Sequence, residues 1–174
     1  MTFIVTRPRE RSSPSDRVRR GTAILVGVVA TALVAIQLVH VDRANPAVRS
    51  DLVAPQEIKS LIRRACFDCH SNETQWLWYS HVAPFSWVIA RDVRAGRRRL
   101  NFSEWADYAS DPETKNHKLR EVVQSIAGGD MAPWYYRVLH SGARLRQDER
   151  QLIIRWASQE ATSASPPGNS PRGD

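Results

Sequence analysis

The chain contains two cysteines, and both lie in one five-residue segment, Cys66-Phe67-Asp68-Cys69-His70. Two thiols three positions apart, followed at once by an imidazole, suit covalent capture of a haem. The thiols can add across the two haem vinyl groups, and the adjacent histidine can bind the iron from one side. The sequence therefore predicts one covalently bound haem c, attached through Cys66 and Cys69, with His70 as the proximal iron ligand.

Three other interpretations of the two cysteines have less support. A lone disulfide across so short a loop would add little stability. A thioredoxin-like redox pair needs a strand–helix–strand setting that the sequence pattern lacks. A zinc site needs further ligands, and the chain has no second cysteine pair.

Residues 21–41 contain no charged side chain. As a helix they would reach about 32 Å, enough to cross a hydrocarbon core of about 30 Å. Six arginines precede this stretch, against Glu10 and Asp16. This excess of positive charge before the apolar stretch predicts a single-pass protein of the bacterial inner membrane, with a cytoplasmic N-terminus and a periplasmic haem domain. A cleaved signal peptide is the alternative, but no clean small-x-small cleavage site follows the apolar run.

The expected organisation has five parts. Residues 1–20 form a basic cytoplasmic tail, 21–41 the transmembrane anchor, 42–54 a linker, 55–161 the haem-binding domain and 162–174 a disordered tail rich in Ser, Pro and Gly. Residues 42–174 hold 19 Lys/Arg and 16 Asp/Glu, a net charge of only +3. Nucleic acid is therefore not an expected partner, whereas the membrane is.

Apolar residues recur at helical spacing in the expected domain, and no segment alternates as a strand would, so the predicted class is all-α. Helices are expected from Pro55, after Pro84, at about 112–127 and at about 147–161, with a short turn near 103–108. Gly128-Gly129 should end the third of these. The expected buried residues are Ile58, Leu61, Ile62, Ala65, Cys66 and Cys69, then Phe85, Val88, Ile89 and Val93, then Leu119, Val122, Val123 and Ile126, and finally Leu152, Ile153 and Trp156.

Met131 is the only methionine besides the initiator. It lies in a loop punctuated by a double glycine and a proline, which is a poor setting for a core methionine and suits a distal iron ligand. His81, in the aromatic loop between Trp76 and Pro84, is the alternative distal ligand. His117 lies in a polar run and should be solvated, and His140 should cap or pack.

Aromatic and basic side chains surround the expected site. Trp76, Trp78 and Tyr79 are candidates for the wall of a haem pocket, although ordinary core packing explains them equally well. The run Arg97-Arg98-Arg99 suits a solvated helix end, with docking of an acidic redox partner or contact with the haem propionates as alternatives.

The string CFDCHSNETQWLWYSHVAPFSWVIARDVRAGRRRLNFSEW, followed by GGDMAPWYYRVLH and DERQLIIRWA, resembles the bacterial haem-binding domain family related to cytochrome c. The resemblance covers roughly residues 45–160. It implies a cytochrome c-like helical fold, with haem on Cys66 and Cys69, His70 as proximal ligand and Met131 as distal ligand. Two positions depart from the family pattern: Ala132 replaces a common proline, and the residue at His81 need not be histidine.

These features favour electron transfer by a single haem, held near membrane redox proteins, over catalysis. One alternative is a haem enzyme, or a gas or peroxide sensor, with a labile or open sixth ligand position. Another is a haem-containing structural subunit of a membrane redox complex. No serine–histidine–carboxylate or paired-carboxylate pattern supports hydrolysis.

Overall fold

The computed structural model describes residues 13–163. The described part is helical, which confirms the all-α class, and its only β-type pairing is an isolated bridge between Ser50 and Glu104. The expected tails at residues 1–12 and 164–174 lie outside the described residues. The α-helices are α1 Pro14–Ala35, α2 Gln56–His70, α3 Phe85–Arg99, α4 Trp105–Ala109, α5 Pro112–Gly128, α6 Trp134–Leu139 and α7 Gln147–Ser163, and the 3-10 helices are η1 Ile36–Leu38, η2 Trp78–His81 and η3 Ser141–Ala143.

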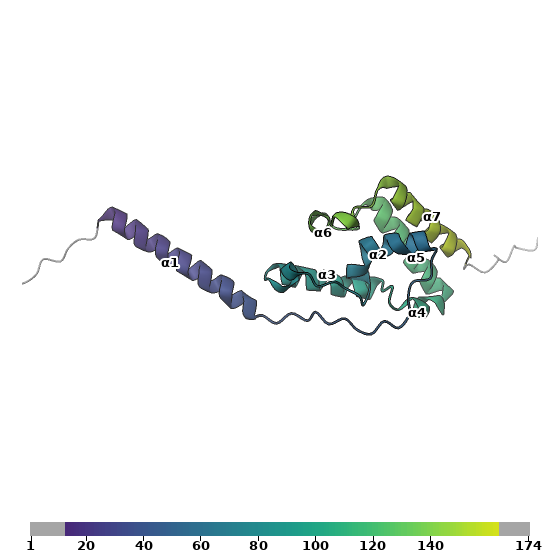
Figure 1. The fold of residues 1–174 in the computed structure, drawn as a ribbon, viewed down its shortest axis with the longest axis horizontal. Helices are drawn as coiled ribbons and strands as arrows, with labels where there is room; N and C mark the ends of the chain where they lie inside the picture. The colour runs from purple at the N-terminus through teal and green to yellow at the C-terminus, as the bar shows by residue number, and fades with distance from the viewer. Residues whose placement is uncertain (1–12, 164–174) are drawn as a thin grey trace, which may run out of the picture.

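Helix α1 projects away from a cluster formed by the other helices (Figure 1). It begins at the Ser13 N-cap, with Pro14 in its first turn. Residues Ser15–Leu38 are long and apolar enough to cross a membrane, and none of the most apolar window is buried by the protein. The helix starts earlier than the expected anchor, residues 21–41, and residues 39–41 are not helical.

The core of the domain lies where α2, α5 and α7 meet the segment from Leu100 to Trp105. A row of aromatic rings runs through it: Phe67 stacks on Phe102 at 5.5 Å, Phe102 lies 6.1 Å from Trp105, and Trp105 lies 6.4 Å from Trp156. This row connects the helix that carries the cysteines to the last helix of the chain.

Helix α5 begins and ends as its sequence predicts. Asp111 caps its N-terminus by accepting a hydrogen bond from the Glu113 amide, with Pro112 in the first turn. At the other end Gly129 has φ of +78°, a conformation that favours glycine. Helix α7 extends two residues beyond the expected end, through Thr162 and Ser163.

The buried face of α3 differs from the expected one. Phe85 and Val88 are 60% and 41% exposed, so their predicted burial was wrong. The buried residues of α3 are small or β-branched: Ser86, Ala90, Val93 and Gly96. The reason is that α3 approaches α2 closely. A Cβ on Gly96 would lie only 2.3 Å from the Cys69 carbonyl oxygen. Among the other residues expected in the core, Ile89, Val122, Val123 and Leu152 are half-buried.

The segment expected as a linker, residues 42–54, is packed on the domain for part of its length. Leu52 is 2% exposed and belongs to the core. The Ser50 amide donates to the Ser103 carbonyl, and the Asn72 side chain donates to the Ala47 carbonyl. The chain thus runs along the domain to reach α2 (Figure 1).

Candidate functional site

Cys66, Cys69 and His70 occupy the last turn and a half of α2. Both cysteines are free thiols and half-buried. Burial raises the pKa of the Cys66 thiol to about 12. Burial, together with the nearby carboxylates of Asp68 and Asp92, raises the pKa of Cys69 to about 12. Both thiols are therefore protonated at neutral pH, and in the folded chain they are poorly suited to disulfide exchange.

The ring of His70 is held in one orientation by the backbone. Its Nδ1 lies 3.1 Å from the carbonyl oxygen of Leu100, which can only accept a hydrogen bond. The proton is therefore on Nδ1, and Nε2 keeps a free lone pair. Burial lowers the pKa of His70, which keeps the ring neutral at pH 7. A neutral imidazole with an oriented Nδ1–H is the form in which histidine ligates a metal.

A buried polar network lies directly behind His70. The Phe102 amide donates to the His70 carbonyl at 2.7 Å. The Asn72 amide donates to the Ser103 hydroxyl at 2.9 Å, and the Asn101 side chain donates to the Asn72 side chain at 2.9 Å. These hydrogen bonds link the segment after the cysteine motif to the segment around Asn101. The periodicity of the sequence gave no sign of this link.

A second polar cluster joins α2 to α6. The Tyr136 hydroxyl donates to a carboxylate oxygen of Asp68 at 2.5 Å. His140 stacks on the Tyr136 ring at 3.8 Å between ring centroids, and its Nε2 lies 2.7 Å from the Tyr79 hydroxyl. His140 therefore packs against its neighbours, as expected. Asp68, which belongs to the same cluster, lies inside the cysteine motif itself. Sequence reasoning also missed α6, although Pro133 before it was a start signal.

Met131 lies in the loop between α5 and α6 and is half-buried. Two tyrosines of α6 tie the end of this loop to the cysteine-bearing region: Tyr136 to Asp68, and Tyr135 to Asp92 of α3 at 2.6 Å. The fold therefore brings the segment that carries Met131 beside α2 and α3. Iron ligation by Met131 stays a prediction. His81, the alternative ligand, is exposed at the end of η2.

The three aromatic residues considered for a haem pocket do not share one environment. Trp76 is half-buried and donates to the Asn45 side chain at 3.2 Å, on the packed linker. Trp78 is 77% exposed. Tyr79 alone joins the polar cluster of Asp68, Tyr136 and His140.

Arg97 is an anchor of the fold rather than part of a solvated helix end. Its guanidinium donates to the carbonyls of Ser71 and Ala44, and to the side chains of Asn45 and Thr74. Arg98 and Arg99, in contrast, are exposed, as expected. His117 is also exposed, in agreement with its expected solvation.

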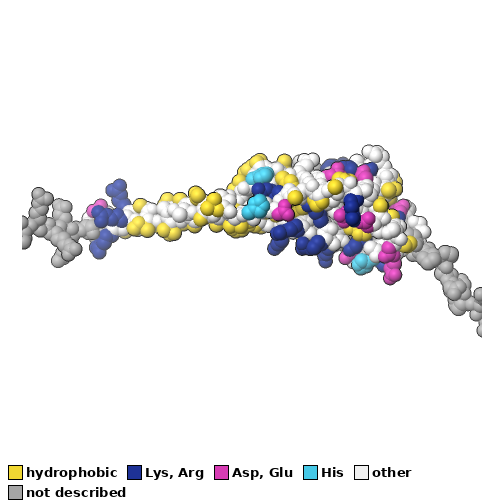
Figure 2. Space-filling model, turned by 90° about the horizontal axis from the view of Figure 1, so that it is seen from below, with side chains coloured by type: hydrophobic (Ala, Val, Ile, Leu, Met, Phe, Trp, Pro, Cys, Tyr) yellow, Lys and Arg dark blue, Asp and Glu magenta, His cyan; other side chains and the backbone are white. Residues whose placement is uncertain are grey.

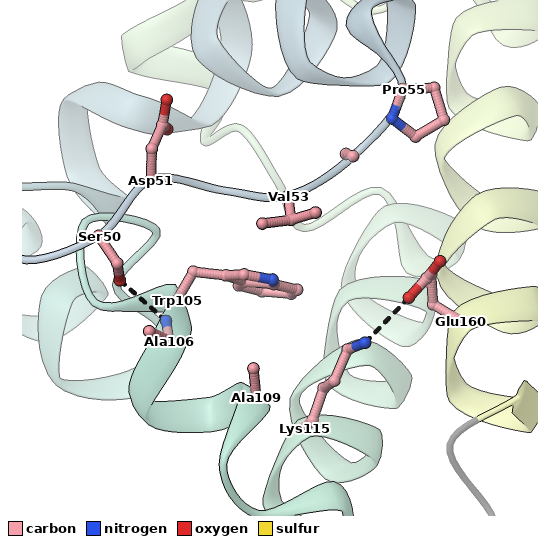
Figure 3. A pocket seen from close by; sticks show the side chains of 10 residues that line it. Ser50, Asp51, Val53, Pro55, Trp105, Ala106, Ala109, Lys115 and Glu160 are labelled. Atoms are coloured by element: carbon pink, nitrogen blue, oxygen red, sulfur yellow. Dashed lines mark hydrogen bonds and ion pairs between the residues drawn. The ribbon is translucent and has the colours of Figure 1, made fainter.

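A pocket of about 510 Å³ lies away from the cysteine motif, between the linker, α4, α5 and α7 (Figure 3). Val53 and the Trp105 ring face each other across it, and Lys115 binds Glu160 at 2.9 Å on one side. It has no cysteine or histidine in its lining and is not the site indicated by the motif. Within residues 13–163 no three His, Cys, Asp or Glu side chains are grouped so as to hold a metal ion.

A family model described as a haem-binding domain matches residues 31–159, from the second half of α1 to α7. The chain belongs to the haem-binding domain family. The match confirms the resemblance found in the sequence, and haem is the cofactor that the family implies. No curated protein and no solved structure matches the chain significantly.

The residues of this haem-binding domain fit a haem. His70 offers a neutral, oriented nitrogen beside two unpaired thiols. Helices α3 and α6 also present large apolar side chains that the protein leaves exposed, and such side chains suit contact with a flat apolar ring. Among these side chains are Trp87, Val88, Trp134, Tyr135, Val138 and Leu139.

Proposed function

We propose that this protein is a membrane-anchored c-type haem protein that transfers single electrons on the periplasmic side of the bacterial inner membrane. One haem c is bound through thioether bonds to Cys66 and Cys69, with His70 as proximal ligand. The observation that carries the proposal is the pairing of two free thiols with a buried, neutral histidine whose Nδ1–H is held by Leu100. When bound, the haem supplies a one-electron couple between ferrous and ferric iron.

The chain's own residues supply orientation and electrostatics. The Leu100 carbonyl fixes the tautomer of His70 and increases the basicity of its Nε2. The network through Asn72, Asn101 and Ser103 holds the backbone after His70 in place, since each buried polar group there has a partner. A rigid ligand set favours electron transfer, because little rearrangement accompanies a change of charge.

Met131 is the proposed distal ligand. Its loop is tied to the haem-bearing region through Tyr136 and Asp68. A thioether favours ferrous iron, so ligation by methionine and histidine raises the reduction potential above that of a bis-histidine haem. If His70 and Met131 both held the iron, the haem would supply electron transfer and leave no position for a substrate, which is why we favour a carrier over an enzyme.

The apolar span Ser15–Leu38 supports the proposed location. It is 24 residues long, three arginines precede it, and Arg17, Arg19 and Arg20 lie in its first turns, so the positive-inside rule favours a domain outside the cytoplasm. A redox protein is the proposed partner, and the exposed Arg98 and Arg99 at the end of α3 would suit an acidic docking surface.

The first test is an absorption spectrum of the full chain, produced in a host with cytochrome c maturation machinery. Colour that survives denaturing electrophoresis, and disappears in the Cys66→Ala/Cys69→Ala double variant, is the expected result. Non-covalent haem in the native protein would overturn the thioether assignment and leave haem binding intact.

The distal ligand is tested by comparing Met131→Ala with His81→Ala. Met131→Ala should abolish the weak far-red methionine–iron band, lower the reduction potential and allow the ferrous protein to bind carbon monoxide. His81→Ala, the matched control, should leave all three unchanged. The reverse pattern would assign the ligand to His81, and carbon monoxide binding by the native protein would favour gas sensing or catalysis at an open iron.

A further inference from the structure

The end of the apolar helix contacts the domain at one defined point. Gln37 is the last residue but one of the candidate membrane span Ser15–Leu38. Its side-chain amide bonds the backbone of Ala83 in both directions: the Ala83 amide donates to Oε1 at 2.9 Å, and Nε2 donates to the Ala83 carbonyl at 3.3 Å. The same Nε2 also donates to Leu33. The loop before α3 is therefore fastened to the end of the candidate membrane span.

Large apolar side chains surround this fastening point and are left uncovered by the protein. Leu77, Trp78, Val82 and Phe85 all lie within six positions of Ala83 along the chain, and we call them the apron. Their exposed fractions are 40%, 77%, 41% and 60%.

The arrangement of the helices directs the apron towards the membrane. The beginning of α3 lies at the end of the domain nearest α1, whereas α4, α5 and α7 lie at the opposite end (Figure 1). In the space-filling view, hydrophobic side chains cover α1 and continue onto the adjoining end of the domain (Figure 2). A surface that is apolar, rich in aromatic rings and continuous with a membrane span has the composition of the membrane–water interface.

We propose that the apron inserts into the outer surface of the lipid bilayer and holds the haem domain against the membrane beside its own anchor. The proposal rests on the retention of α1 as a membrane anchor. Trp78 and Phe85 enter the interfacial region. There an aromatic ring loses contact with water, while the backbone polar groups nearby keep their contact with water. The Gln37–Ala83 bonds fix the distance of the apron from the end of the span.

Docking of this kind limits the positions that the haem can take. A domain on a free tether samples a volume set by the length of its linker, whereas here the linker is packed and the apron gives a second attachment. Electron exchange would then be directed to partners that lie in, or on, the same membrane surface.

The test uses the full-length haem-loaded protein in nanodiscs of phosphatidylcholine and phosphatidylglycerol that contain a photoreactive diazirine phospholipid. After illumination and proteolysis, mass spectrometry locates the lipid adducts. We expect adducts in α1 and also in residues 77–85, and none in α4 or α5. Adducts confined to α1 would overturn the proposal while leaving the anchor in place.

A double variant, Trp78→Glu with Phe85→Glu, should lose the adducts in residues 77–85 and keep those in α1. Both positions are exposed, so the haem spectrum and the fold should not change. The matched control is Val53→Glu, an exposed apolar residue (75%) on the linker, which lines the pocket beside α4 and should leave all adducts unchanged. An altered haem spectrum with unchanged lipid adducts would assign the apron to the haem and overturn the proposal. An intact mass that lacks α1 would show cleavage, and would overturn the anchor and the docking together.

Discussion

The two ends of the helical domain are completed in different ways. At the end built from α2, α5 and α7, Ile153 and Ala157 are fully buried and Trp156 is only 6% exposed. At the end formed by the beginning of α3 and by α6, Phe85 is 60% exposed and Trp134 is 71% exposed. The first end buries its apolar residues against the chain itself. The second leaves its apolar residues exposed, and we propose that a group outside the chain, the haem or the lipid, covers them.

The attachment of the last two helices shows the same contrast. Helix α7 packs along α5 and contributes Ile153 and Trp156 to the core. Helix α6 has no buried residue and is tied down by the hydroxyls of Tyr135 and Tyr136. Apolar packing is spread over many contacts, whereas a tether depends on one hydrogen bond, so α6 should be the more easily displaced of the two.

The largest effect is expected from Trp156→Ala at the packed end. Loss of a buried tryptophan from a filled core should lower the free energy of unfolding by about 3–5 kcal/mol. Denaturant unfolding of the haem-loaded protein measures this. The control, Trp134→Ala, removes a ring that the chain itself leaves exposed, and in the absence of haem it should change stability by about 0.5 kcal/mol or less. A large loss for Trp134→Ala that disappears when haem is absent would show that the haem covers this ring.

Gly96→Ala tests the junction between the two ends. The new methyl group would meet the Cys69 carbonyl, which belongs to the backbone and has little freedom to move. We expect a loss of about 3 kcal/mol, the upper part of the range for overpacking, together with a shifted haem spectrum. Gly27→Ala, in α1, has no heavy atom within 4 Å of the new Cβ and should have no effect. Equal behaviour of the two variants would contradict the close contact of α2 with α3.

A smaller effect is expected from Tyr136→Phe, which removes the hydroxyl that donates to Asp68. The cost to global stability should be about 1 kcal/mol, the usual value of one hydrogen bond. Loosening of α6 should also weaken the far-red methionine–iron band and increase carbon monoxide binding, which a purely structural role elsewhere would not do. Tyr135→Phe removes the more exposed tether to Asp92 and should change these signals less. If neither variant alters them, α6 does not position Met131.

Sequence-based prediction succeeded at one end of the domain and failed at the other. The packed end was largely predictable, because its helices carry apolar residues at helical spacing and have clear limits such as Asp111 and Gly129. The open end was not. Phe85 and Val88 have the spacing of a buried stripe, yet α3 presents its small residues to α2, since only they permit so close an approach.

At the candidate site, the sequence indicates the residues that we propose carry the chemistry, but it does not indicate those that orient them. Cys66, Cys69 and His70 are adjacent in the chain, and the requirements of the chemistry are visible in their spacing. The carbonyl of Leu100 is a backbone group and has no sequence signal of its own. The partner of Asp68 is Tyr136, on a short helix whose apolar residues remain exposed, so that periodicity gave no sign of it.

The sequence alone therefore determined the family, the helical class and the apolar span, and it indicated the three residues that we propose hold the haem, because each depends on local spacing or composition. The tertiary structure decided which face of α3 is buried, which carbonyl holds His70, and how Gln37 fastens the apron to the end of α1. These features depend on contacts between segments 27 or more positions apart in the chain. Their formation is governed by the packing of whole helices, which no short stretch of residues specifies.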